Sequence, residues 1–165
     1  ITRTHTMIKS LTTGGTIDKI YFDATSEYEI GDPTIPHIFS EVGVHAEYEL
    51  ESVMRKDSLD ISDDDRDVLK QKCEGTKQER ILITHGTDTM CQTAEYLLGI
   101  EEKTIVLTGA LSPARFRVTD AVFNLGLAMG AVQSLPAGVY IAMSGEVFEA
   151  GKVRKNREKG RFETI

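Results

Sequence analysis

Three short segments rich in threonine and glycine mark this sequence. They are 12–16 (TTGGT), 84–89 (THGTDT) and 108–110 (TGA). Each follows or ends a short apolar run that predicts a β-strand. A threonine hydroxyl is a candidate nucleophile, and glycine lets a ligand approach the backbone closely. Because ligands bind at the carboxyl ends of the strands in an open parallel sheet, the three segments predict one hydroxyl-lined mouth.

Other familiar kinds of site do not fit these segments. No G-x-G-x-x-G dinucleotide fingerprint follows the first strand, and the sequence contains no G-x-x-x-x-G-K-[ST] phosphate loop. The G-x-S-x-G serine elbow of the α/β-hydrolases is also lacking. The four histidines and two cysteines have no ligand spacing, so we expect no metal site and no cofactor. A hydroxyl nucleophile activated by a lysine or an aspartate is compatible with these segments.

Each of these residues also has an ordinary structural role. Threonine forms strands and caps helices, and Asp88 stands where a helix N-cap belongs. His85 fits a hydrogen-bonded core histidine better than a catalytic base. Taken singly, each threonine is more often structural than catalytic. The convergence of several such features on one edge of one sheet favours a functional site.

Segments typical of strands and of helices alternate along the chain. The predicted strands are 7–13, 44–50, 80–84, 104–108 and 138–143. The predicted helices run from an N-cap at Ser62 to Gly75, from 87–89 to Gly99, and from 119–120 to a stop before Pro136. This alternation predicts an α/β fold of three layers, with a mostly parallel sheet and helices on both faces. A small terminal β-hairpin is predicted at 147–154, with a turn at Gly151.

Two of the predicted helices carry apolar residues at helical spacing. These residues are Met90, Ala94, Leu97 and Leu98 in one helix, and Val122, Leu125, Met129 and Val132 in the next. We expect both stripes to face the sheet.

Composition narrows the class of protein. The 165 residues are enough for one domain with a full core, and 40% hydrophobic with 27% charged residues is ordinary for a globular chain. The net charge of −7 argues against a nucleic-acid binder. The basic cluster at 152–157 is, on charge alone, expected to be a solvated edge. No stretch approaches the roughly 18 apolar residues of a membrane span.

The two cysteines and the lack of a signal-like start predict free thiols in a reducing, cytoplasmic compartment. Residues 1–6 are expected to be a leader or an expression remnant, so the domain is taken as 7–165.

Residues 13–17 (TGGTI) resemble the T-G-G-T-I signature of the bacterial-type L-asparaginase family. Residues 84–90 (THGTDTM) resemble its second signature, T-H-G-T-D-T-M, without a break. The segment 108–110, with Asp120 and 123–125 (FNL), resembles the family's third block. The resemblance covers nearly the whole chain but only the family's amino-terminal domain, and we expect the carboxy-terminal domain to be absent.

The resemblance implies a catalytic site residue by residue. Thr16 matches the nucleophilic threonine on the loop after the first strand, and Tyr28 matches the tyrosine that hydrogen-bonds it. Thr87 and Asp88 match the second threonine and its acidic neighbour. Lys155 matches the lysine that pairs with Asp88 and tunes Thr87, although it stands in the basic cluster.

The resemblance also implies where the substrate binds. The expected binding residues, for the α-carboxylate and the developing oxyanion, are Gly15, Asp57, Ser58, Gly86 and Ala110. Two departures bear on specificity. Leu59 stands where many members have a glutamine, and Leu111-Ser112-Pro113 replaces Met-Arg-Pro.

The implied activity is hydrolysis of the side-chain amide of asparagine, or of a close small amide, to aspartate and ammonia. Two alternatives stay open. The chain could be an amino-acid-binding or regulatory module of the same ancestry, or an ammonia-supplying component of an amidotransferase. We expect a small amino-acid amide as ligand, neither nucleic acid nor membrane as partner, and a homodimer or tetramer, because a lone first domain exposes apolar surface.

Overall fold

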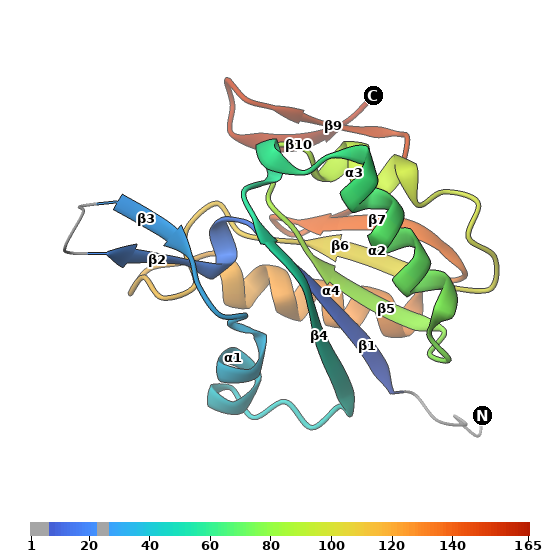
Figure 1. Ribbon diagram of the computed structural model, residues 1–165, viewed down its shortest axis with the longest axis horizontal. Coiled ribbons are helices and arrows are strands. Elements are labelled where there is room, and N and C mark those ends of the chain that lie inside the picture. The colour runs from blue at the N-terminus through green and yellow to red at the C-terminus, as the bar shows by residue number, and fades with distance from the viewer. Residues whose placement is uncertain (1–6, 23–26) are drawn as a thin grey trace.

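A six-stranded sheet forms the centre of the structure, a computed structural model that describes residues 7–22 and 27–165 (Figure 1). Its order is β4-β1-β5-β6-β7-β8, and only β8 runs antiparallel to its neighbour. The strands are β1 (Ile8–Gly14), β4 (Tyr48–Lys56), β5 (Arg80–Thr84), β6 (Thr104–Thr108), β7 (Gly138–Met143) and β8 (Glu146–Glu149). The predicted fold class is confirmed. The prediction for residues 1–6 lies outside the described residues.

The central strands are short apolar runs because both of their faces are covered. β6 is buried at every position, and β5 at every position but its first. Thr12, Thr84 and Thr108 stand at one level across β1, β5 and β6, since Thr12 pairs with Thr84 and Thr84 with Thr108. The threonine-rich segments therefore leave the sheet at the same edge.

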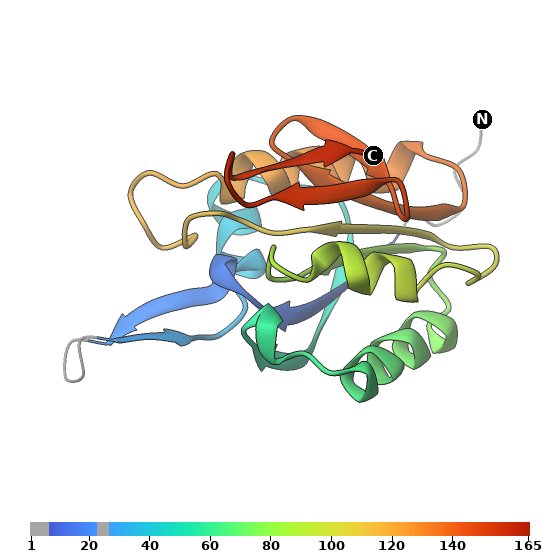
Figure 2. The ribbon, with the colours of Figure 1, turned by 90° about the horizontal axis from the view of Figure 1, so that it is seen from above.

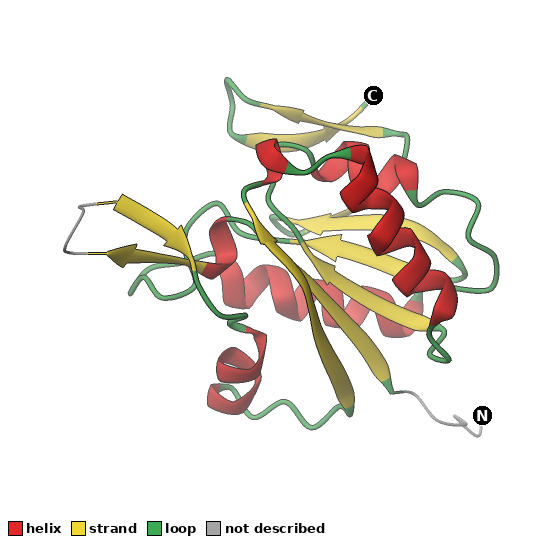
Figure 3. Cartoon of the chain, in the orientation of Figure 1, coloured by secondary structure: helices red, strands yellow, loops and turns green. Residues whose placement is uncertain are grey.

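Helices cover the two faces of the sheet, as Figures 2 and 3 show. On one face lie α2 (Asp63–Gly75) and α3 (Met90–Tyr96), whose core cluster includes Leu69, Ala94 and Ile83. On the other lie α1 (Ile35–Glu41) and α4 (Ala121–Ser134), whose cluster includes Phe39, Leu125 and Val106. Within the described residues, no helix has the length and apolar character to cross a membrane.

Two small antiparallel hairpins flank the sheet. One joins β2 (Lys19–Phe22) to β3 (Glu27–Ile30), follows the 3-10 turn η1 (Thr16–Asp18) and extends away from the body of the domain (Figure 1). The other joins β9 (Val153–Asn156) to β10 (Arg161–Thr164). A second 3-10 turn, η2 (Ser58–Asp60), follows β4.

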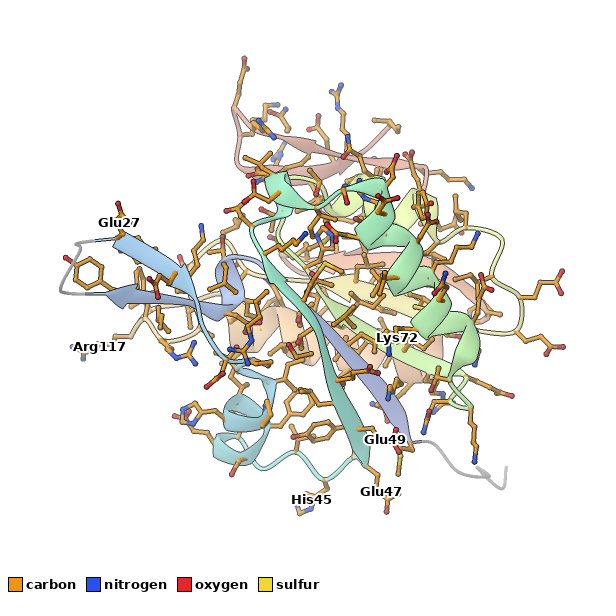
Figure 4. All side chains as sticks on the ribbon, viewed as in Figure 1. Glu27, His45, Glu47, Glu49, Lys72 and Arg117 are labelled. Atoms are coloured by element: carbon orange, nitrogen blue, oxygen red, sulfur yellow. The ribbon has the colours of Figure 1, made fainter. Side chains whose placement is uncertain are left out.

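The edge strand β4 is lined by charge. Lys9 Nζ lies 3.5 Å from carboxylate oxygens of both Glu49 and Glu51, and Lys72 Nζ lies 2.7 Å from Glu51. Figure 4 shows Glu49 and Lys72 on this side of the domain. Charged side chains at an edge strand discourage pairing with another chain.

The predicted strand at 44–50 is wrong in its limits, because β4 begins at Tyr48 and continues to Lys56. Residues Val44 and Ala46 instead pack against the α1–α4 side of the core from the preceding connection. The 147–154 hairpin is also wrong in its partners, because β8 pairs with β7, and β9 pairs with β10. The predicted terminal hairpin therefore exists, but further along the chain.

Two of the residues predicted to face the core do not. Leu98 is 47% exposed because α3 ends at Tyr96, and Gly99 then turns with φ of 93°. Val122, in the first turn of α4, is 43% exposed, whereas Leu125, Met129 and Val132 of that stripe are buried.

Candidate active site

Three of the predicted catalytic side chains meet at the carboxyl edge of the sheet. Thr87 and Asp88 lie on the loop between β5 and α3, and Lys155 reaches them from β9. Lys155 Nζ donates to Thr87 Oγ1 at 2.8 Å and to Asp88 Oδ1 at 2.8 Å. A residue 67 positions away along the chain from Asp88 thus closes the group. The β9–β10 hairpin matters to the site because it carries this ammonium group.

Asp88 is held in its ionised form. The hydrogen bond from Lys155 lowers the pKa of Asp88 below its usual value, and partial burial opposes this effect less strongly. Arg157 and Lys19 add favourable charge, with Arg157 Nη2 at 3.8 Å from Asp88 Oδ1. Lys155 itself is well covered, with 15% of its side chain exposed. The ammonium and the carboxylate therefore form a partly shielded pair beside a hydroxyl.

Thr16 approaches this group through a backbone contact. Gly15 has φ of 81°, and a Cβ atom placed on it would lie 2.4 Å from the Gly86 nitrogen. The residues that follow these two glycines are Thr16 and Thr87, so both start from touching loops. Thr16 is half-buried and begins η1. Within the described residues, no hydrogen bond joins its side chain to Thr87, Asp88 or Lys155.

The predicted substrate-binding segment completes one wall. A Cβ atom on Gly86 would lie 2.8 Å from Ser58 Oγ, so Ser58 covers this glycine. Ser58 is 2% exposed, and its carbonyl oxygen accepts a hydrogen bond from Thr89 Oγ1 at 2.7 Å. Asp57 accepts from the Leu59 N–H at 3.0 Å and pairs with Lys19 at 3.4 Å. Leu59 is 63% exposed beside this segment.

Tyr28 is not joined to Thr16. It lies on β3 with 53% of its surface exposed, and its ring packs 5.5 Å from that of Tyr21 and 6.1 Å from that of Phe116. The hydrogen bond that the resemblance implies between Tyr28 and Thr16 does not occur in the described part of the chain. The β2–β3 hairpin instead holds Tyr28 in an aromatic cluster, apart from the group that Lys155 forms with Thr87 and Asp88.

Ala110, the remaining predicted binding residue, is fixed from behind. It is 1% exposed, and the Asn124 side chain donates to the neighbouring Gly109 carbonyl at 2.9 Å. Asp120 accepts from the Leu111 N–H at 2.9 Å and also from Asn124 Nδ2 at 3.0 Å. Asp120 and Asn124 therefore hold the loop after β6 in place.

His85 is the satisfied core histidine that the sequence predicts. It is 1% exposed, with Nδ1 at 2.7 Å from the Gly86 carbonyl oxygen and Nε2 at 2.8 Å from Thr93 Oγ1. Arg66, buried on α2, donates from Nε to the same Thr93 oxygen at 3.0 Å. This chain of bonds supports the Gly86–Thr87 loop from the core side.

Sequence reasoning missed the cations Lys19, Arg66 and Arg157 near the site. Their only signal was charge, and charge does not distinguish a solvated residue from one that faces a carboxylate. Arg157 in particular belongs to the cluster interpreted as an edge, and its side chain is 65% exposed. Among residues 7–22 and 27–165, no group of three His, Cys, Asp or Glu side chains could hold a metal ion.

The family model and the relatives found by comparison agree on one family. The family model described as "Asparaginase, N-terminal" matches residues 7–163. The "Probable L-asparaginase periplasmic" of Haemophilus influenzae is 33% identical over 161 residues, which cover 90% of this chain and 46% of that protein. A glutamyl-tRNA(Gln) amidotransferase subunit of Methanococcus maripaludis is 37% identical over 98 residues, or 54% of this chain and 23% of that one.

A solved structure agrees with these similarities. That of the "Probable Cytoplasmic L-asparaginase" from Campylobacter jejuni superposes with a TM-score of 0.82 at 29% identity. The match covers 97% of this chain and 53% of that one. The chain therefore spans about half the length of the asparaginases that it matches.

Proposed function

The chain belongs to the asparaginase family, in which it corresponds to the amino-terminal domain, and from that premise we propose that it hydrolyses the side-chain amide of asparagine or of a close small amide. Thr16 is the proposed nucleophile. Aspartate and ammonia are the proposed products.

One observation carries the proposal: the Lys155 ammonium group bridges Thr87 Oγ1 and Asp88 Oδ1, at 2.8 Å from each. A purely structural edge has no need for a well-covered lysine between a hydroxyl and an ionised carboxylate. Groups whose pKa values are perturbed by specific partners gather at functional sites. The contact of Gly15 with Gly86 supports Thr16 as the group that works beside this pair.

In the proposed reaction, Thr16 Oγ1 attacks the amide carbon and the carbonyl oxygen becomes an oxyanion. Loop N–H groups at Thr87 and Ala110 are the proposed donors to that oxyanion, each such donor being worth roughly 2.7–4 kcal/mol. The Gly15 N–H instead donates to the Lys56 carbonyl oxygen at 3.0 Å. The carbon–nitrogen bond then breaks, and ammonia leaves with the proton that Thr16 gave up. Water attacks the resulting ester, which releases aspartate and restores the Thr16 hydroxyl.

Lys155 and Thr87 are the proposed carriers of the proton. A threonine hydroxyl is a weak nucleophile near neutral pH and needs a neighbouring base. Lys155 can act as that base once it has lost one proton, and Asp88 holds its Nζ at Thr87. Ser58 and the Asp57 segment are proposed to bind the substrate's α-carboxylate. A hydrogen bond from Tyr28 to Thr16 would require a movement of the β2–β3 hairpin.

The test is ammonia release from asparagine, glutamine and small β-amides by the wild-type protein and by Thr16→Ala. We expect the variant to lose at least about 10³-fold in turnover, because it lacks the nucleophile. Thr164→Ala, at an exposed position that ends β10, is the matched control and should keep full activity. Lys155→Met should also lose activity, whereas Lys152→Met, with a 70% exposed side chain, should not. Equal release by wild type and Thr16→Ala would remove Thr16 from the mechanism.

A second candidate is an ammonia-supplying component of an amidotransferase, favoured by the similarity to the glutamyl-tRNA(Gln) amidotransferase subunit of Methanococcus maripaludis. This role requires the same amide hydrolysis but a partner protein that receives the ammonia. A third outcome separates both from a binding module of the same ancestry. If no amide releases ammonia, but asparagine or aspartate raises the melting temperature, the site binds without catalysis.

A ligand and a cellular compartment are also part of this proposal. A small amino-acid amide is the proposed ligand. The cytoplasm is the proposed compartment, which suits the free thiols of Cys73 and Cys91.

A further inference from the structure

A buried carboxylate stands two residues after Thr16. Asp18 ends the turn η1 and is 2% exposed. Its Oδ1 accepts hydrogen bonds from the Thr34 N–H at 2.9 Å and from the Thr34 hydroxyl at 2.8 Å. Thr34 itself is 3% exposed and is the N-cap residue of α1. The start of the β2–β3 hairpin is thereby tied to the segment that follows its end.

Arg115 ties the same two segments a second time. Its Nη1 donates to the Asp18 carbonyl oxygen at 3.3 Å, and its Nη2 donates to the Asp32 carbonyl oxygen at 3.2 Å. The Asp18 carbonyl oxygen also accepts from the Gly31 N–H at 2.8 Å. One guanidinium fork thus joins both sides of the hairpin base, a task for which its planar geometry is suited.

The loop that carries Arg115 is itself anchored. The Ala114 N–H donates to the Ile17 carbonyl oxygen at 3.0 Å. At the other end of the loop, Asp120 accepts from the Leu111 and Ser112 N–H groups at 2.9 Å and 3.0 Å. The loop after β6 therefore connects the Ala110 wall of the site with the base of the hairpin.

We propose that Asp18 and Arg115 are positioning residues, which form a clamp that holds Thr16 at the correct place for attack. Thr16 lies between two fixed points. On one side, Gly15 rests against Gly86. On the other, Ile17 and Asp18 are held by Ala114, Arg115 and Thr34.

The catalytic effect of the clamp rests on the proposed function. A displacement of about 1 Å at a reacting atom can cost roughly 100-fold in rate, although nothing that binds substrate has changed. Loss of the clamp therefore lowers kcat and leaves KM nearly constant. Burial of a carboxylate costs free energy unless hydrogen bonds compensate for the lost water. The two Thr34 donors supply such hydrogen bonds to Asp18.

The decisive experiment measures kcat and KM for ammonia release from asparagine in four variants. Asp18→Ala and Arg115→Ala should each lower kcat by about 10- to 100-fold, with KM changed less than about threefold. Asp18→Asn should recover most of kcat, because its amide oxygen can accept both Thr34 hydrogen bonds. Asp32→Ala is the matched control. It removes an exposed carboxylate at the same hairpin base, whose partner is Arg55 at 2.7 Å, and should leave both constants unchanged.

A second readout keeps the clamp separate from the activity. Amide hydrogen exchange at Gly31 and Thr34 should be about tenfold faster in Asp18→Ala and Arg115→Ala than in wild type. Arg117→Ala, two residues from Arg115 and labelled on the surface in Figure 4, should not change it. Unchanged exchange in both clamp variants would overturn the clamp, even if all proteins were active.

The two failures are distinguishable. If exchange accelerates and kcat does not fall, the clamp is structural only, and the positioning role is overturned. If wild type releases no ammonia from any amide, the proposed function fails, and with it the positioning role, while the exchange rates still report the clamp itself. A marked rise in KM in Asp18→Ala or Arg115→Ala would assign the substituted residue to substrate binding and would also contradict the proposal.

Discussion

At the scale of single residues, His85 shows how one ring can be fixed in a single protonation state. A carbonyl oxygen can only accept, so Nδ1 must carry the hydrogen that it shares with the Gly86 oxygen. Burial lowers the pKa of His85 and so keeps the imidazole neutral near pH 7. In the neutral ring Nε2 accepts from the Thr93 hydroxyl, whose oxygen accepts in turn from Arg66, and the chain of bonds then has one consistent direction.

Protonation of His85 should therefore destabilise the protein in mild acid. Burial lowers the pKa of His85 from 6.5 to about 4, with Arg66 lowering it further and the Gly86 contact opposing. Between those two values the unfolded chain binds a proton that the folded chain does not, so the free energy of unfolding falls as pH falls from 6.5 to about 4. The full effect is about 3 kcal/mol.

Urea unfolding at several pH values between 4 and 7 checks this prediction. His85→Gln should flatten the acid dependence, whereas His45→Gln, an exposed histidine, should leave its slope intact. Burial raises the pKa of Asp18, an effect of opposite sign that all three proteins share, so their comparison removes it. Three paired carboxylates with lowered pKa values, Asp88, Glu51 and Asp65, lose their stabilising contribution only as the pH falls below the ordinary carboxyl range. Identical slopes in wild type and His85→Gln would contradict the assignment of a neutral His85.

Residue identity predicted much of the site but not all of it. The motifs around Thr16, Thr87 and Asp88 are local, so their place at strand ends could be read directly from the chain. Lys155 required a resemblance, because nothing in its neighbourhood indicates which of several basic residues turns inward. Tyr28 shows the limit of such transfer: it lies on a hairpin whose direction depends on packing with Phe116, not on its own spacing.

At the scale of elements, helix α2 begins with a complete capping box. Ser62 Oγ accepts from the Asp65 N–H at 3.2 Å, and Asp65 Oδ2 accepts from the Ser62 N–H at 2.9 Å. Lys56 also donates to Asp65 at 2.8 Å, which links the end of β4 to this helix. The cap therefore fixes the connection that carries Asp57 and Ser58.

Ser62→Ala should lower the free energy of unfolding by about 1 kcal/mol, because the Asp65 N–H loses its acceptor. Urea unfolding measures this change. Ser40→Ala, an exposed serine in α1 whose side chain makes no hydrogen bond among the described residues, should change stability by less than about 0.5 kcal/mol. Equal stability of wild type and Ser62→Ala would show that the cap contributes nothing in this setting.

Buried strands were predicted correctly from the sequence, and exposed strands were not. The strands at 80–84, 104–108 and 138–143 agree with β5, β6 and β7, because a strand covered on both faces leaves a continuous apolar run. The edge strand β4 alternates with exposed residues, and its alternation does not mark where pairing with β1 starts. The β2–β3 hairpin was not predicted at all. Its strand β3 is exposed at Glu27, Tyr28 and Glu29, so burial left no pattern to read.

At the scale of the whole molecule, a groove runs between α1 and α4, and part of it is apolar. One cavity of about 630 Å³ and a neighbouring one of about 330 Å³ share the lining residues Ile38, Val42 and Val122. The smaller cavity is lined mainly by apolar residues, whereas the larger one is also lined by Glu41, Arg115 and Arg117. Apolar surface that is open to solvent commonly marks an interaction site.

We expect the protein to form a homodimer or tetramer, as proposed from the sequence, with this groove inside the contact. Light scattering after size-exclusion chromatography measures the mass. Val122→Asp should shift the protein toward monomer, because it introduces a charge into an apolar interface. Val68→Asp is the matched control, since Val68 is 44% exposed on α2 and faces away from the groove. A monomeric wild-type protein would contradict this expectation.

The touching glycines at the site have a practical consequence for protein engineering. Even alanine at Gly15 or Gly86 would need the two loops to separate, since the added carbon would lie 2.4 Å from the Gly86 nitrogen or 2.6 Å from Ser58 Cβ. A mutant library aimed at new amides should therefore leave both glycines untouched. Leu59 is 63% exposed beside the segment proposed to bind the α-carboxylate, and it is the position at which to randomise. Proline should be left out there, because the Leu59 N–H donates to Asp57 at 3.0 Å.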